Sequence, residues 1–215
     1  MPVFMAFSFL SMLSSSDSIN FEGVKQYVNN PDNFAMVVLI FAGILAFCGG
    51  LNTGGGTVLS REGRSFWLIK LLPVSPKEIV LGKLLSALSF SFACIILPLL
   101  LALVITGNII VILSSAILGG LLCFIITCCT VMVDFLRPKF DWTNYTQVIK
   151  QSANAFFVFL LDFFVIGIFA GLSALLGILL PPYLQILLLS VLFLGISVIT
   201  YNIVIKAATK GLEKL

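Results

Sequence analysis

Histidine is absent from this sequence, and charged residues are few. Of its 215 residues, 10% are Asp, Glu, Lys or Arg. A soluble domain has about 25% charged residues, so this chain has too little polar surface to cover itself in water. The lack of histidine removes the commonest general base and the commonest metal-binding side chain. We therefore expect no enzyme activity and no catalytic, metal or cofactor site in this chain.

Cysteine pairs and basic clusters of the kinds that bind metals or nucleic acids are also missing. The cysteines lie in apolar runs, and no two are spaced as C-x-x-C, so we expect them to pack as small hydrophobic residues. The 12 Lys and Arg residues are separated by long apolar segments, which argues against a nucleic-acid partner. The five cysteines are Cys48, Cys94, Cys123, Cys128 and Cys129.

Long apolar segments dominate what is present, since 60% of the residues are hydrophobic. A helix needs about 20 mainly apolar residues to cross a bilayer. A shorter apolar run at residues 2–13 predicts a partial span. The predicted fold class is therefore all-α, a single polytopic transmembrane bundle over residues 1–215 with five full spans and one partial N-terminal span. The full spans are expected at residues 34–53, 84–106, 109–133, 154–180 and 184–205.

The basic residues gather in three of the stretches that separate or follow these spans. Five of the 12 lie in residues 61–83, three in 137–150 and three in 206–214, and the twelfth is Lys25. If the helices alternate in direction, these stretches share one side of a cell membrane. The positive-inside rule places them, as loops 54–83 and 134–153 and the C-terminal tail 206–215, in the cytoplasm.

The turns predicted on the opposite side are short. One consists of Gly107 and Asn108, and the other of residues 181–183. Connections of this length force the helices that they join to lie antiparallel and side by side. We therefore expect two helical hairpins.

Residues 60–73 have the pattern of a short helix at the membrane surface. Polar residues come first, and the Phe66-Trp-Leu-Ile69 cluster follows them. Aromatic side chains favour the depth of the lipid headgroups, so membrane lipid is an expected partner of this segment. Pro73 is predicted to end the helix, because proline has no amide N–H to donate.

A second helix is predicted to start directly after this turn. Ser75 and Glu78 have the spacing of a capping box, and Pro76 suits the first helical position. We expect this helix to run unbroken into the span at 84–106. The interfacial helix, the turn and the new helix together form what we call the elbow, which either anchors the loop in the interface or serves as a lever for a soluble partner.

Two motifs in the basic loops resemble a family of transporters. The first is Ser60-Arg-Glu-Gly-Arg-Ser-Phe-Trp67, with Leu72-Pro-Val-Ser-Pro-Lys77 and Gly82-Lys83 after it. The second is Asp134-Phe-Leu-Arg-Pro-Lys-Phe-Asp-Trp142, with Val148-Ile-Lys-Gln151 and Asn154 after it. They are similar to motifs of permease subunits of type-2 bacterial ABC exporters, in particular the large ABC permeases of Gram-positive bacteria. The resemblance covers residues 34–215 and matches a C-terminal half, so we expect a fragment or a split permease.

The resemblance implies an ATP-driven exporter with a separate ATP-binding ABC ATPase subunit and a second permease half or a homodimer. The Gly-rich residues 49–57 lack the G-K-[ST] ending of a phosphate-binding loop, so the ATPase is expected to be another polypeptide. These glycines instead favour unwinding or close packing of the span. By resemblance, residues 61–72 contact the ATPase, with Arg61, Glu62, Arg64, Phe66, Trp67 and Lys70 as the contact residues and Pro73, Ser75, Pro76 and Glu78 as the elbow turn and cap.

Asp162 is the only charged residue well inside a predicted span, about 12 Å from its start at Asn154. At that depth a carboxylate must face protein or water, or be protonated. Two interpretations stay open: a residue of a substrate or ion pathway, or a protonated acid hydrogen-bonded to Ser or Thr hydroxyls. On the same span, Gly167 and Gly171 are spaced for close helix approach. The alternative functions are a proton-coupled secondary transporter that uses Asp162, and a non-transporting membrane partner or fragment.

Overall fold

The computed structural model describes residues 21–50, 55–71, 73–142 and 153–213. These residues contain helices and no strand, which confirms the predicted all-α class. The partial span predicted at 2–13 lies outside the described residues. With η for 3-10 helices, the elements are α2 (Phe21–Val28), η1 (Pro31–Asn33), α3 (Phe34–Gly50), η2 (Gly55–Thr57), η3 (Ser60–Ser65), α4 (Phe66–Leu71), α5 (Pro76–Thr106), α6 (Ile109–Leu136), α8 (Ala153–Leu179) and α9 (Pro182–Glu213).

Within the described residues, five helical segments are long and apolar enough to cross a membrane, and they contain α3, α5, α6, α8 and α9. They confirm the five predicted full spans, with different ends. Helix α3 is described from Phe34 to Gly50, and the predicted end of this span at residue 53 lies outside the described residues. Helix α9 continues past residue 205 to Glu213, because Ala208 and Leu212 are buried and extend its packed face.

Both predicted hairpins are present. Gly107 ends α5 with a φ of 62°, a left-handed conformation that favours glycine, and its N–H donates to the Leu103 carbonyl. The Asn108 side chain then accepts a hydrogen bond from the Ile110 N–H at 3.0 Å and begins α6. Helices α8 and α9 are joined at Pro181, whose carbonyl accepts from the Gln185 N–H.

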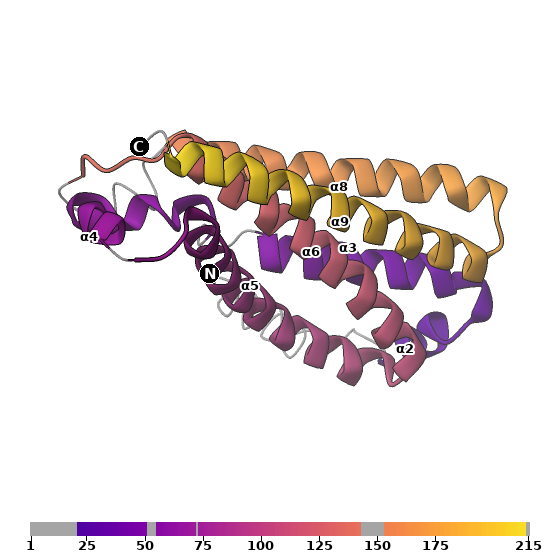
Figure 1. The fold of residues 1–215 in the computed structure, drawn as a ribbon. Coiled ribbons are helices and arrows are strands. Elements are labelled where there is room, and N and C mark those ends of the chain that lie inside the picture. Colours follow the sequence, from indigo (N-terminus) through magenta and orange to yellow (C-terminus); the bar gives the residue numbers. More distant parts are fainter. Residues whose placement is uncertain (1–20, 51–54, 72, 143–152, 214–215) are drawn as a thin grey trace.

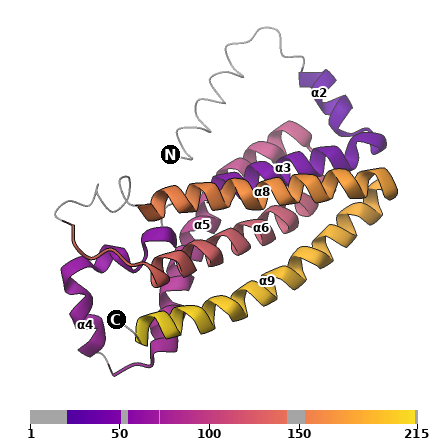
Figure 2. The same ribbon diagram turned by 90° about the horizontal axis from the view of Figure 1, so that it is seen from above.

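The long helices run along one axis, with α4 at one end and α2 at the other (Figures 1 and 2). The α4 end also holds the start of α5 and the last turns of α6 and α9, and we call it the elbow end. The opposite end, with the two hairpin turns, is the hairpin end. Helices α3 and α9 pack on α6 at the centre of the bundle.

Close packing of α3 on α6 depends on glycine. A methyl group added to Gly119 of α6 would lie 3.1 Å from the Ala42 carbonyl oxygen of α3. One turn further along, Gly49 of α3 faces the sulfur of Cys123. The glycines thus let the two backbones approach, as the sequence predicted for the Gly-rich end of this span.

Helices α5 and α8 form the outer surface of the bundle. In the most apolar 18-residue stretch of each helix, only 17% is buried within the chain. Large apolar side chains such as Val104 and Phe164 are therefore exposed to lipid or to another protein. The close approach predicted at Gly167 and Gly171 is not made within the described part of the chain, since a methyl group at either would meet nothing within 4 Å.

Candidate functional site at the elbow

The turn of the elbow has the local structure that the sequence predicts. The Ser75 side chain accepts from the Glu78 N–H, and the Glu78 carboxylate accepts from the Ser75 N–H at 2.8 Å. Pro76 occupies the first helical turn. The resulting helix, α5, continues from Pro76 to Thr106 with Pro98 inside it, so this turn is directly connected to a membrane-spanning helix. Pro73 lies between the two helices, as expected.

The prediction of a single helix before this turn is wrong in one respect. The structure has two segments there, the 3-10 helix η3 and the α-helix α4. Gly63 has φ 51° and ψ −128°, and this break lies inside the 3-10 helix η3, three residues before α4 begins at Phe66. The ring of Trp142 lies against Gly63, where a methyl group would come within 2.7 Å of the indole. The indole N–H also donates to the Ser60 carbonyl at 2.9 Å. The break at Gly63 thus coincides with a contact to a residue that is distant in the sequence.

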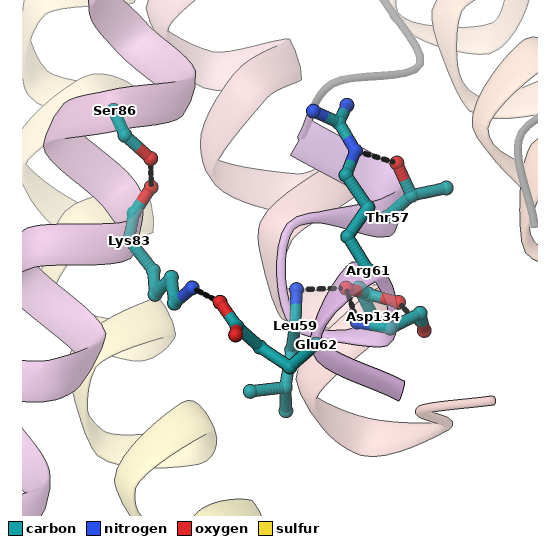
Figure 3. A network of polar contacts seen from close by, with 8 residues as sticks. Thr57, Leu59, Arg61, Glu62, Lys83, Ser86 and Asp134 are labelled. Atoms are coloured by element: carbon teal, nitrogen blue, oxygen red, sulfur yellow. Dashed lines mark hydrogen bonds and ion pairs between the residues drawn. The ribbon is translucent and has the colours of Figure 1, made fainter. Parts of the chain in front are cut away.

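Asp134, in the last turn of α6, anchors the start of η3 (Figure 3). Its carboxylate is fully buried and accepts hydrogen bonds from the Leu59 N–H at 2.6 Å and the Ser60 N–H at 3.0 Å. The Ser60 hydroxyl donates to its other oxygen. Hydrogen bonds to a charged group contribute about 1.5–3 kcal/mol each. Asp134 therefore joins the loop before α4 to the end of a membrane-spanning helix.

Ser60 extends this connection to the second basic loop. Its hydroxyl oxygen accepts from the Lys139 N–H at 2.9 Å, while its carbonyl accepts from Trp142. The Phe66 ring of α4 stacks on Phe140, with ring centroids 4.6 Å apart. Segments that are separate in the sequence, 55–71 and 137–142, thus form one unit.

A second connection joins this unit to α5. The Glu62 carboxylate of η3 forms an ion pair with the Lys83 ammonium, two turns into α5 (Figure 3). The side chains are 30% and 22% exposed, so water reaches both and the pair adds little to stability. The pair matters more for the arrangement of the elbow, because it holds η3 against α5. Arg61 donates to the Thr57 hydroxyl at 3.0 Å within the same loop.

The structure separates the predicted ATPase-contact residues into different environments. Trp67 is 58% exposed and Arg61 is exposed, whereas Phe66 is buried. Glu62 points to Lys83. The side chains of Arg64 and Lys70 lie outside the described part of the structure.

The exposed face of α4 is apolar. Trp67, Leu68 and Leu71 are at least half exposed there, and Val74 continues this surface into the turn. A groove of about 460 Å³ lies between this segment and α5. Its walls combine apolar side chains with both signs of charge, and it is lined by Glu62, Ile69, Val74, Glu78, Ile79, Gly82, Lys83 and Ser86.

Asp162 lies away from the elbow, inside the bundle on α8. Its side chain is fully buried, and neither carboxylate oxygen has a hydrogen-bond partner among the described residues. The interpretation in which Ser or Thr hydroxyls bind it is therefore not what the structure shows. A charged group at the centre of a membrane costs about 2.5 kcal/mol or more.

Sequence reasoning missed Asp134, Ser60, Trp142 and Lys83 as site residues. All four belong to the motifs that resemble ABC permeases, but neither composition nor helical spacing shows that they meet. A usable signal was Asp134 itself, a carboxylate at the boundary of a predicted span, where an isolated charge is costly unless it is paired.

The buried carboxylate of Asp134 is stabilised by backbone and hydroxyl donors, and the described residues contain no cluster of three His, Cys, Asp or Glu that could hold a metal ion. What the arrangement does is couple an exposed apolar helix to two membrane-spanning helices. Comparisons of this chain with protein-family models, with curated proteins and with solved structures find no match.

Proposed function

We propose that this chain is a membrane-spanning component of an ATP-driven exporter, and that a separate ATPase subunit acts on its elbow. The observation that carries the proposal is the exposed apolar face of α4, on a segment tied to α6 through Asp134 and to α5 through Glu62 and Lys83. An apolar face at the end of the bundle is an unfavourable surface to leave in water. Membrane lipid or a protein partner must cover it.

In the proposed mechanism, the ATPase subunit moves α4 during its cycle. The motion passes through η3 to Asp134 and so to the end of α6, and through the turn at Ser75 to α5. Helix α6 has no interior proline, so its far end moves with its elbow end, whereas α5 contains Pro98, a point at which it can bend. Alternation between two arrangements of these helices would expose a substrate path first to one side and then to the other.

The geometry refines the proposed roles of the elbow residues. Trp67 and Arg61 lie on the partner surface, and we assign Arg64 and Lys70 to the same surface from their positions in the sequence. Phe66 holds α4 on Phe140 from the inside. Glu62 is engaged with Lys83, so we assign it to transmission instead of contact.

The sequence motifs and the charge distribution support this proposal. The resemblance to type-2 ABC permeases lies mostly in the loops that the structure brings together at the elbow end. The positive-inside rule places the same loops in the cytoplasm, where a soluble ATPase is found. The exposed apolar surfaces of α5 and α8 suit a second permease half or a second copy of the chain.

Photo-crosslinking from the elbow tests the proposal. A photoreactive amino acid at position 67 should capture a subunit that binds and hydrolyses ATP, in membranes of the cell that makes the protein. The matched control is position 183, where Tyr183 is 63% exposed near the hairpin end, and it should capture no such subunit. Failure to capture an ATPase from position 67, or transport in vesicles driven by a proton gradient without ATP, would contradict the proposal.

A further inference from the structure

The contact between α8 and the end of α3 places a carboxyl group against a helix backbone inside the bundle. Asp162 is fully buried, and a methyl group added to Gly50 would lie 3.3 Å from both its Cγ and its Oδ1. The same added methyl would lie 3.1 Å from Ile126 of α6. A side chain at position 50 would therefore crowd the carboxyl group.

Among the described residues, no positive charge lies beside Asp162. Helix α3 has no charged residue, and η2 has none. Helix α6 contributes the Cys123 thiol, which lies within electrostatic reach of Asp162, and its only charged residue is Asp134 in the last turn. On α9, Lys206 and Lys210 lie at the elbow end. An ionised Asp162 would therefore be both buried and unpaired.

A protonated carboxyl is neutral and can donate a hydrogen bond, so it suits this buried, unpaired position better than a carboxylate does.

We propose that Asp162 is an intramembrane proton-binding site that is neutral when α8 is packed against α3 at Gly50. Loss of the proton creates a charge that the packed arrangement cannot solvate, so α3 and α8 must separate enough to admit water. A proton is the ligand that fits, because a metal ion needs several oxygen or sulfur ligands and no cluster of three acidic, His or Cys residues exists among the described residues. This inference goes beyond the proposed export function and does not depend on it.

Infrared spectroscopy of the protein in lipid nanodiscs tests the proposal directly. At neutral pH the wild type should show the C=O stretch of a protonated carboxyl, and this band should disappear reversibly at alkaline pH. The band should be absent from Asp162→Asn and retained in Asp141→Asn, which changes an exposed carboxyl outside the spans. An Asp162→Asn spectrum identical to that of the wild type would overturn the proposal, and so would a band that persists at every pH.

Two further measurements keep the test valid if Asp162→Asn does not fold. Dicyclohexylcarbodiimide, an apolar reagent that adds to protonated carboxyls, should modify Asp162 of the wild type at neutral pH and not at alkaline pH. Gly50→Ala should move the pH at which the infrared band disappears, whereas Gly43→Ala in the same helix, with nothing within 4 Å, should not. Absence of labelling at both pH values, or equal effects of the two substitutions, would contradict the proposal.

Discussion

Asp134 and Asp162 are two fully buried aspartates with opposite surroundings. Asp134, at the elbow end, accepts hydrogen bonds from two backbone N–H groups and one hydroxyl. Asp162, on α8, has no partner for either oxygen among the described residues. Burial is the same in both cases, so burial does not decide what each carboxyl does. Donor groups make the first a structural anchor, and their absence leaves the second free to exchange a proton.

The comparison also separates two parts of the molecule. At the elbow end, polar contacts join segments distant in sequence into one unit. In the interior, contacts are apolar and depend on glycine, with Gly49, Gly50 and Gly119 allowing α3 to approach its neighbours. We expect the elbow end to lose stability when a single polar group is removed. We expect the interior to lose stability when a side chain is added at one of these glycines.

The largest effect is expected from Asp134→Asn. The substitution removes the charge and turns an amide NH2 group toward backbone donors that already need an acceptor. Leaving such buried donors unsatisfied costs about 3 kcal/mol in total. Thermal or denaturant unfolding in detergent micelles should show this loss, together with faster proteolysis of residues 55–71. Wild-type stability in Asp134→Asn would mean that the carboxylate is not an anchor.

Gly63→Ala is expected to have the next largest effect. A side chain at φ 51° and ψ −128° is strained, and the new methyl group meets the Trp142 ring. We expect a loss of about 2 kcal/mol in the free energy of unfolding. Gly82→Ala is the control, because Gly82 is helical and has open space around it. This substitution should raise the free energy of unfolding, by at most about 1 kcal/mol. Equal stabilities of the two variants would refute the role of the break at Gly63.

A smaller effect on stability is expected from breaking the Glu62–Lys83 ion pair. Both side chains are partly exposed, so a double-mutant cycle with Glu62→Ala and Lys83→Ala should give a coupling energy of about 0.5 kcal/mol. The consequence for function should be larger, with ATP-driven transport lost while insertion in the membrane is unchanged. Lys77→Ala, at an exposed position of the same helix, is the control. Normal transport without the pair would remove Glu62 from the transmission route.

Only a small effect on stability is expected from Asp162→Asn as well. At neutral pH a protonated acid and an amide have nearly the same shape and no charge, so the free energy of unfolding should change by less than about 1 kcal/mol. The comparison with Asp134→Asn is then direct, since the same substitution is made at two equally buried sites. Equal losses at both positions in the same unfolding assay would show that the surroundings of the two carboxyls are not what separates them.

Features set by neighbours in the chain were predictable. The five spans follow from apolar length, the hairpins from short turns, and the cap at Ser75 and Glu78 from local hydrogen bonding. Each of these depends on groups a few residues apart, where the sequence fixes the geometry.

Features that depend on distant contacts were not predictable from local pattern. Leu59 and Ser60 bind an aspartate about 75 positions away, and no periodicity encodes that pairing. The break at Gly63 likewise lies against Trp142, a residue distant in the sequence. For Asp162, the cost of its depth could be predicted, but the lack of a hydroxyl partner depends on how α3, α6 and α8 pack.

The side of the membrane that the elbow faces is the most direct test of the account. Trp67→Cys and Tyr183→Cys place thiols at opposite ends of the bundle, while the native cysteines lie within the spans, out of reach of a membrane-impermeant maleimide. The thiol at position 67 should react in inverted vesicles and not in intact cells, and the thiol at position 183 should do the reverse. Labelling of position 67 from outside intact cells would contradict an elbow driven by a cytoplasmic ATPase.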